Sequence, residues 1–418
     1  MNILIIPDKH SIYDYEMVKN FALGFEELGC SAVALSKNVS ADELETAQEL
    51  HKADLIIHIN TLLREEHKIG KAKYISWIQD YFPSQASAFA EHDAERSRIL
   101  AMGSAAHLGI PDFGVEIGSL DVGVPAPKSG QPQKDLSRNH DLAILGFIPK
   151  KSSISPPYNG ALELRYLTRS LAFHLLPKRL RKSNIISAMV DLLTTADSRL
   201  PSILRELLMR YVEVEYNPLT GTLNVNQLYE DLTRLIEKHY PWYKPIENEL
   251  DFISQTFPRY LDRILLGRMA VKLGRDLNIW GSGWFSYPEF RRVYRGILQN
   301  KSEVLEVLGN TKAILCNNTH GIFIHPTVLD AIAQGAFVFW HETPSSVDVN
   351  ASLMDPVFGG FEPNRHFGLY SPMDFDEAIN SWSPELMTKA TLEARGILME
   401  RHLWKHRARA VLDIFEGF

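Results

Sequence analysis

The sequence predicts an α/β protein with two doubly wound domains, and three observations support this prediction. Residues 1–125 alternate short runs rich in β-branched residues with helical patterns, which is typical of a parallel sheet covered by helices. Residues 124–132 are rich in Pro and polar residues and predict a linker. Strand patterns then return between residues 141 and 340. At 418 residues, the chain is long enough for more than one domain with its own core.

The first domain should contain five strands with helices between them. The helix Tyr15–Leu28 carries apolar residues at helical spacing and stops at Gly29, a favourable residue after a helix end. Ser40 and Glu43 form a capping-box pattern that opens a second helix, which runs to about His51. The expected strands are Asn2–Pro7, Ser31–Leu35, Asp54–Asn60, Tyr74–Ile78 and Ile99–Met102.

The second domain should begin with a strand at Asp141–Phe147 and then be interrupted. Residues 150–261 are nearly all helical in pattern and predict a helical insertion. Sheet patterning returns with the strands Leu277–Trp280, Ala313–Cys316 and Ala336–Trp340. The expected boundaries are a first domain at 1–125, a linker at 126–140, a second domain at 141–400 and a C-terminal helix at 401–418.

Composition excludes several classes of protein. Hydrophobic residues make up 45% and charged residues 23%, which are ordinary globular values. The net charge of −7 gives no overall attraction to nucleic acid or anionic lipid. The basic run Lys178–Lys182 could contact a phosphate-rich or lipid surface locally, but it is more typical of a solvated helix end. Cys30 and Cys316 form no redox or metal-binding motif. Without a signal peptide or an apolar run of about 20 residues, a cytoplasmic protein with no transmembrane segment is expected.

The first candidate motif is Gly281-Ser282-Gly283, directly after a predicted strand. Glycines in that position allow a ligand to approach the backbone. The motif is not a dinucleotide fingerprint, because the third glycine is missing and Tyr287 and Pro288 follow instead of a helix start. An ordinary turn between buried tryptophans is an equal alternative.

The second candidate motif joins a strand, a polar loop and a helix between Asn317 and Ala336. The helix begins at Pro326, so its free amides and positive dipole end suit a diphosphate. Thr327 adds a hydroxyl donor there, and Asp330, one turn further on, can accept the two hydroxyls of a ribose. The alternative is an ordinary loop–helix–strand unit with an incidental capping Thr327.

Together these motifs resemble the C-terminal domain of the CgeB-like (spore-maturation-protein) glycosyltransferases. The resemblance covers about Asp141–Phe147 and Leu277–Leu412, and it rests on the order of Leu145-Gly146, Trp280–Trp284, Val293–Gly296, Thr311–Leu315, Asp330–Ala336 and Tyr370–Pro372, with the final helix around His402–Arg407. It implies a GT-B fold, in which two Rossmann-like domains face a cleft. The second domain would bind a nucleoside-diphosphate sugar, and the first would bind a glycan or protein acceptor.

The resemblance implies a set of donor-binding residues, with two departures from the family pattern. Thr327 and Asp330 stand where the family has Arg and Glu, so the phosphate charge must be offset elsewhere, with His325, His320, Lys312 and Arg295 as candidates. The T-x-x-D pattern is similar to the S-x-x-E of plant-type UDP-sugar transferases. The implied donor-binding residues are Gly146, Gly281, Ser282, Gly283, Lys312, Asn317, His320, His325, Thr327 and Asp330.

GT-B enzymes need no metal or other cofactor, and the candidate metal motifs have simpler explanations. Asp374-Phe375-Asp376 could be a metal-binding D-x-D, but Ser371 and Asp374 fit a capping box at a helix start better. His402 and His406 have zinc-like i, i+4 spacing, but the sequence offers no third ligand and a surface helix face is the simpler interpretation.

The predicted function is sugar transfer from a nucleoside-diphosphate sugar to an acceptor hydroxyl. The general base that deprotonates the hydroxyl should lie on the first domain, where Asp80 and His10 follow strands of the sheet, although either could be a simple loop or cap residue. Two alternatives remain open, a GT-B epimerase or hydrolase and a non-catalytic nucleotide-binding assembly protein. The helical insertion could recognise a large acceptor or mediate oligomerisation.

Overall fold

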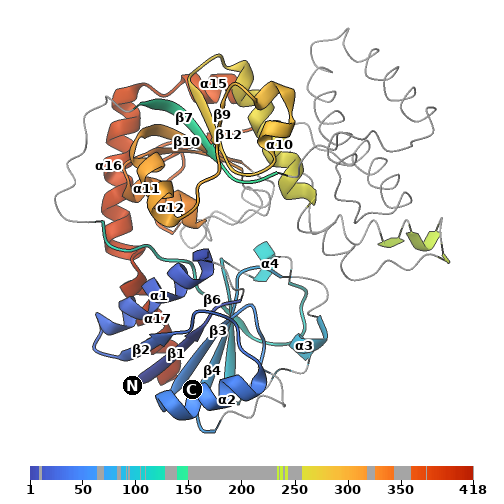
Figure 1. Ribbon diagram of the computed structural model, residues 1–418, viewed down its shortest axis with the longest axis vertical. Helices are drawn as coiled ribbons and strands as arrows, with labels where there is room; N and C mark the ends of the chain where they lie inside the picture. Colours follow the sequence, from blue (N-terminus) through green and yellow to red (C-terminus); the bar gives the residue numbers. More distant parts are fainter. Residues whose placement is uncertain are drawn as a thin grey trace.

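The computed structural model describes two six-stranded parallel sheets, one in each half of the molecule (Figure 1). Part of the sequence lies outside the described residues, including His10, His320, Lys178–Lys182 and most of the predicted insertion. The described residues are 1–8, 12–63, 70–81, 86–90, 92, 95–103, 105–108, 110–127, 139–148, 233–234, 236–238, 241–242, 257–317, 325–342, 359–372 and 374–417.

The first sheet has the strand order β2-β1-β3-β4-β5-β6, and all neighbours are parallel. Its strands are β1 (Asn2–Ile6), β2 (Ser31–Ala34), β3 (Leu55–Ile59), β4 (Lys73–Ile78), β5 (Ser97–Ala101) and β6 (Ile117–Ser119). The helices between them are α1 (Ile12–Glu26), α2 (Ala41–His51), α3 (Ala86–Ala90) and α4 (Ala105–Leu108). Five strands match the predictions, whereas β6 is too short and polar to leave a sequence pattern.

Alternation along the strands explains why helices cover both faces of this sheet. In β1, Ile3 and Ile5 pack toward α1, whereas Leu4 and Ile6 pack toward α2. The predicted capping box is confirmed, since Ser40 and Glu43 each accept a hydrogen bond from the other's backbone amide.

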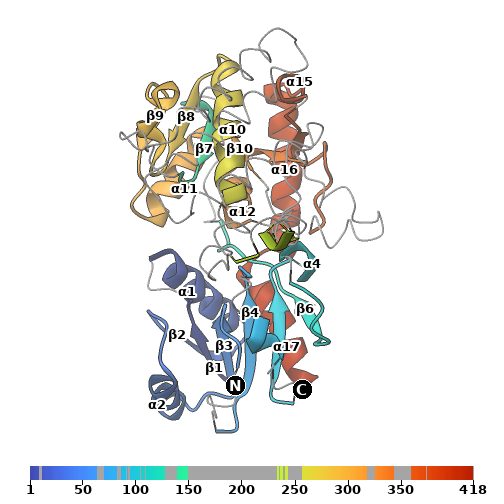
Figure 2. The same cartoon turned by 90° about the vertical axis from the view of Figure 1, so that its right-hand side faces the viewer.

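The second sheet has the order β9-β8-β7-β10-β11-β12, so its strand order reverses between β7 and β10. Its strands are β7 (His140–Leu145), β8 (Leu277–Trp280), β9 (Tyr294–Gly296), β10 (Thr311–Cys316), β11 (Phe337–His341) and β12 (Gly368–Tyr370). Its helices are α10 (Phe257–Lys272), η3 (Trp284–Ser286), η4 (Pro288–Phe290), α11 (Lys301–Gly309), α12 (Pro326–Ala333), α15 (Phe375–Asn380) and α16 (Pro384–Arg401). One face packs against α10 and α15, and the other against α11 and α12 (Figure 2).

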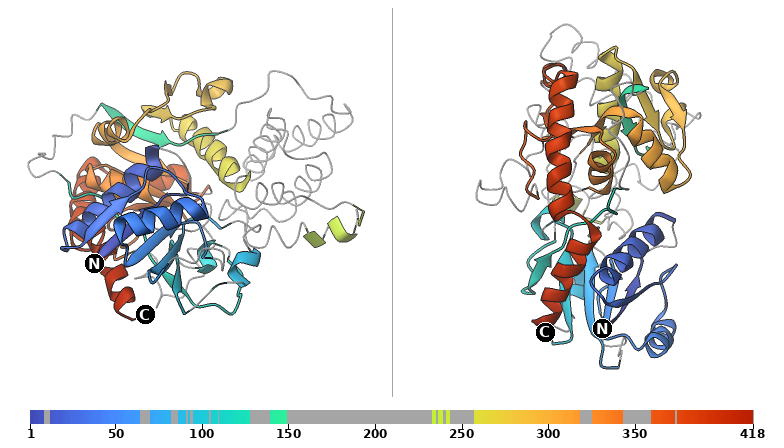
Figure 3. Two further views of the ribbon diagram at one scale, coloured as in Figure 1. Left: turned by 60° about the horizontal axis from the view of Figure 1, so that its bottom comes forward. Right: turned by 90° about the vertical axis from the view of Figure 1, so that its left-hand side faces the viewer.

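The chain crosses between the domains twice, and the two crossings lie side by side. Val124 on the outward segment forms a parallel bridge with Leu403 on the return, with Trp404 donating from N to the Val124 oxygen at 3.1 Å. The last helix, α17 (Trp404–Glu416), then packs against α1 of the first domain (Figure 3). Trp404 contacts Phe21 of α1 with ring centroids 5.1 Å apart. The return crossing therefore contributes a helix to the first domain.

His402 sits inside this crossing, so the predicted surface helix face is wrong for it. The residue lies between α16 and α17, not on one helix with His406, and is only 2% exposed. Its Nδ1 accepts from Arg407 Nη2 at 2.6 Å, and its Nε2 faces the Gly359 carbonyl. Burial, together with the Arg407 charge, lowers the pKa of His402 to about 3.

We expect His402 to make folding pH-dependent. Because its folded pKa is about 3 and its unfolded pKa is about 6.5, the unfolded chain binds the extra proton between these values, and stability falls as pH drops below about 6.5. The slope is at most about 1.4 kcal/mol per pH unit. Melting temperatures of the wild type and His402→Gln, measured from pH 7.5 to 5, should converge as the pH falls; a constant difference would contradict this.

No helix among the described residues is long and apolar enough to cross a membrane.

Candidate functional site

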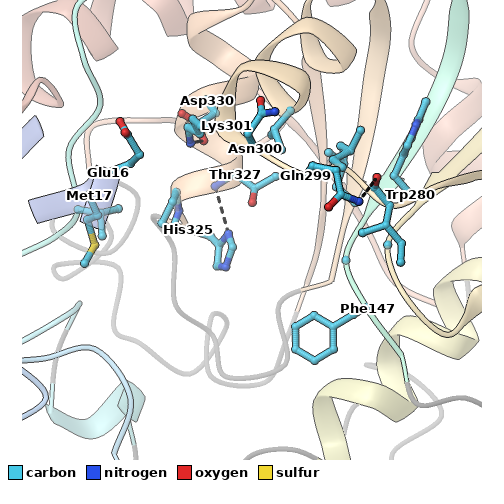
Figure 4. A pocket seen from close by; sticks show the side chains of 18 of the residues that line it. Glu16, Met17, Phe147, Trp280, Gln299, Asn300, Lys301, His325, Thr327 and Asp330 are labelled. Carbon is cyan, nitrogen blue, oxygen red and sulfur yellow. Dashed lines mark hydrogen bonds and ion pairs between the residues drawn. The ribbon is translucent and has the colours of Figure 1, made fainter. Parts of the chain in front are cut away.

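A cavity of about 570 Å³ lies between the two domains, at the carboxyl ends of the second sheet's strands (Figure 4). Ligands of open α/β sheets bind where the strand order reverses, here between β7 and β10. Walls come from the segments after β7 and β8, from α10, from residues 297–301 and from the start of α12. The first domain adds Glu16, Met17 and Asn20 of α1, and the crossing segment adds Val122, Gly123 and Pro125.

The floor of the cavity is made by two loops that continue the pairing of β7 with β8. Gly146 donates from N to the Trp280 carbonyl, and Ile148 donates from N to the Ser282 carbonyl, each at 3.0 Å. Gly281 has a φ of +129°, and a Cβ there would lie 1.8 Å from the Gly146 oxygen. The absence of a side chain at Gly281 therefore lets the backbones of the two loops come into contact. From the sequence, a ligand was expected to make this close approach to the backbone.

The polar end of the cavity is the N-terminus of α12, which begins at Pro326 as predicted. His325 is its N-cap and accepts at Nδ1 from the Thr327 amide at 3.2 Å. The surrounding protein lowers the pKa of His325 to about 4, with further lowering by Arg263 and Arg259. Without a ligand the ring is therefore neutral at pH 7 and offers an Nε2–H donor.

Two arginines of α10 supply positive charge to the cavity. Arg259 and Arg263 are one helical turn apart and both line the cavity. Arg263 donates from Nη1 to the Phe147 carbonyl at 3.0 Å and from Nε to Asn317 Oδ1 at 3.3 Å. Burial lowers the pKa of Arg263 to about 10, which leaves it charged at pH 7. The i, i+4 spacing of the two arginines is visible in the sequence. It did not point to the site, because Arg259 falls at the end of the predicted insertion and Arg263 directly after it.

Asp330 faces the cavity from α12, one turn beyond Thr327. Its side chain is 5% exposed and accepts from Nζ of Lys301, the first residue of α11. Burial raises the pKa of Asp330, and Lys301 opposes that rise. Lys301 also lines the cavity, and sequence analysis missed it because a lysine at a helix start carries no distinctive pattern.

The structure brings together six of the predicted donor-binding residues and separates others from them. Lys312 lies at the amino end of β10, whereas the cavity is at the carboxyl end of the strand. Its Nζ pairs there with Asp141 Oδ1 at 2.5 Å. Arg295 is held by Asn278 on the neighbouring strand. These placements argue against phosphate contacts by Lys312 and Arg295. Gly283 and Asn317 support the walls, and the six residues that line the cavity are Gly146, Gly281, Ser282, His325, Thr327 and Asp330.

Asp80 lies across the cleft, directly after β4 of the first domain. Asn60 fixes its backbone, since Asn60 Oδ1 accepts from the amides of Gln79 and Asp80 at 2.6 and 3.2 Å. The carboxylate meets Arg259 of α10, with Oδ1 3.4 Å from Nη2. Asp80 therefore contacts a residue of the cavity wall, although it does not itself line the cavity.

Asp374 of the candidate D-x-D motif accepts hydrogen bonds from Ser371. Ser371 donates from both N and Oγ to Asp374 Oδ1, at 2.7 and 2.8 Å. Asp374 is itself the N-cap of α15, so the predicted capping box starting at Ser371 is wrong in detail. Within the described ranges, no three His, Cys, Asp or Glu side chains are grouped so that they could hold a metal ion.

Part of the second half of the chain is similar to a known family. Residues 259–413 match the model of a family described as "Glycosyl transferase-like". This segment begins at Arg259 and includes α10, the start of α12 and Asp330, so it carries most of the cavity wall. A search of curated proteins found no match.

Three solved structures illustrate the similarity of fold. The Anabaena protein HepE in complex with UDP-glucose has a TM-score of 0.50 at 8% identity, with 100% of both chains covered. A glycosyltransferase from Rickettsia africae has a TM-score of 0.47 at 12% identity, covering 100% of this chain and 97% of its own. A sucrose-phosphate synthase from Thermosynechococcus elongatus has a TM-score of 0.44 at 8% identity, covering 100% and 98%. The two Rossmann-like sheets confirm the predicted GT-B fold.

Proposed function

We propose that this protein is a glycosyltransferase that moves a sugar from a nucleoside-diphosphate sugar to an acceptor hydroxyl. The observation that carries the proposal is the cavity at the strand-order reversal of the glycosyl transferase-like domain, where a helix N-terminus, two arginines and a buried carboxylate converge. The sequence resemblance to CgeB-like glycosyltransferases also supports it.

The cavity contains residues that could bind the diphosphate, the ribose and the base of a nucleotide sugar. The diphosphate lies at the N-terminus of α12, between the Thr327 hydroxyl and the guanidinium groups of Arg259 and Arg263. Asp330 accepts the ribose hydroxyls. Trp280 and Gln299 also line the cavity (Figure 4), and we propose that the base lies beside them. We propose uridine as the nucleoside, because UDP-glucose is the ligand in the structure of HepE.

The acceptor approaches from the first domain, where Asp80 is the proposed general base. Its carboxylate is partly exposed and faces the cleft beside Arg259. A base in this position takes the proton of the acceptor hydroxyl as the oxygen attacks the anomeric carbon, and the nucleoside diphosphate leaves.

We expect the transfer reaction to proceed without a divalent cation. Arg259 and Arg263, together with the α12 amides, place positive charge where negative charge develops on the leaving diphosphate. Donor turnover measured with EDTA should therefore equal turnover measured with added Mg²⁺ or Mn²⁺. A rate that collapses with EDTA and returns with Mn²⁺ would contradict this expectation.

A thermal-shift screen tests the donor site directly. UDP, GDP and ADP should be compared at equal concentrations, and UDP at about 100 times its dissociation constant should stabilise the folded protein by about 2.7 kcal/mol. Failure of all three to raise the melting temperature would contradict the proposed donor site, whereas nucleotide binding without any sugar turnover would favour the non-catalytic alternative. Sugar release or epimerisation without an acceptor would instead favour the hydrolase or epimerase alternative.

A further inference from the structure

We infer that Arg259 exchanges partners, pairing with Asp80 before the donor binds and with a donor phosphate afterwards, so that donor binding releases the Asp80 carboxylate. This inference rests on the proposed function. It assigns to Arg259 a role that links the two domains, in addition to charge compensation.

The position of Arg259 allows both contacts. It lies on α10 one turn before Arg263, and it lines the same cavity as Thr327 and His325 at the start of α12. In the same position its Nη2 is 3.4 Å from Asp80 Oδ1.

The two partners of the ion pair differ in how firmly they are held. Asn60 fixes the backbone of Asp80 through the amides of residues 79 and 80, and Asn60 in turn donates from Nδ2 to Asp8 Oδ2 at 3.1 Å. Arg259 reaches the carboxylate at the end of a long side chain through one contact at 3.4 Å. The guanidinium is therefore the group that moves when a stronger partner arrives.

A diphosphate is the stronger partner. The side chains of Asp80 and Arg259 are 38% and 31% exposed, and ion pairs this open to water contribute little to stability. A diphosphate carries more charge and offers bidentate oxygens, and Arg263 and the α12 amides hold it in place. The exchange is therefore favourable. It also imposes an order, since Asp80 becomes free to act as a base only when a donor occupies the cavity.

The exchange predicts a specific pattern in UDP binding measured by calorimetry on the full chain. Arg259→Gln should weaken UDP binding roughly tenfold or more, because it removes a charged hydrogen-bond donor to phosphate. Asp80→Asn should tighten UDP binding about two- to fivefold, because Arg259 no longer has to leave an ion pair. When Arg259 is already replaced by Gln, Asp80→Asn should leave UDP affinity unchanged. The difference between the effects of Asp80→Asn in the two backgrounds is the coupling energy that the double-mutant cycle measures.

Glu16→Gln is the matched control, since it removes a different first-domain carboxylate, one that does line the cavity. It should change UDP affinity less than Asp80→Asn does, and equally in both backgrounds. If Asp80→Asn tightens binding as much in the Arg259→Gln background as in the wild-type background, simple repulsion explains the effect and the exchange is overturned. Unchanged affinity in Asp80→Asn overturns it as well. A wild-type protein that binds neither UDP, GDP nor ADP overturns the proposed function itself.

Discussion

Replacing Asp330 with Asn should weaken UDP binding by roughly 30-fold. The carboxylate is placed to accept both ribose hydroxyls, and hydrogen bonds to charged groups contribute about 1.5–3 kcal/mol each. Asn keeps one acceptor oxygen, so a net loss of about 2 kcal/mol is expected. Asn also preserves the shape of the buried side chain and an acceptor for Lys301, whereas Ala would remove both the side-chain volume and the ion pair of residue 330 with Lys301.

The comparison of UDP with 2′-deoxy-UDP makes this test specific for the ribose contact. Wild type should prefer UDP, and Asp330→Asn should lose most of that preference. Asp141→Asn is a matched control, because Asp141 also pairs with a lysine, Lys312, but at the far end of the sheet. It should bind UDP like wild type. If Asp330→Asn retains both affinity and preference, Asp330 does not bind the ribose.

Replacing Gly281 with Ala should destabilise the second domain by about 3 kcal/mol, lowering its melting temperature by about 6–12 °C. Two costs add, a positive φ of +129° and a Cβ only 1.8 Å from the Gly146 oxygen. The loops after β7 and β8 would have to separate. Loss of the floor should also abolish nucleotide stabilisation of whatever protein remains folded, as measured by calorimetry with and without UDP.

Gly296→Ala separates the two costs. Gly296 has a similar φ of +112°, but a Cβ there would have no atom within 4 Å. It should cost about 1 kcal/mol, from the backbone conformation alone. Equal destabilisation by the two substitutions would show that the contact between the loops contributes nothing beyond backbone strain.

Local patterns in the sequence were enough to predict most of the fold. The capping box at Ser40 and the helix start at Pro326 are encoded within four residues of each position, and the structure confirms both. By contrast, β6 and β12 are three residues long and are defined by the neighbours they pair with. Strands this short contain too few residues to show the alternation of apolar and polar side chains that predicts a strand from sequence.

The candidate site was less predictable, because its charges come from separate parts of the chain. Arg259 and Lys301 reach the cavity only through the packing of α10 and α11 against the second sheet. The lowered pKa of His325 depends on the protein packed around the ring and on Arg263 and Arg259, and the residues next to His325 in the sequence do not reveal these surroundings. Lys312 fits the family pattern, but its position at the amino end of β10 becomes clear only with the strand's direction.

The pairing of α17 with α1 has a consequence for synthesis on the ribosome. The first sheet is translated early, yet the helix that covers α1 and supplies Trp404 is translated after the whole second domain. Until residues 404–416 emerge, Phe21 and Trp77 keep one apolar side uncovered. The domain that is made first is thus completed last, and nascent chains stalled before residue 404 should bind chaperones through this exposed surface.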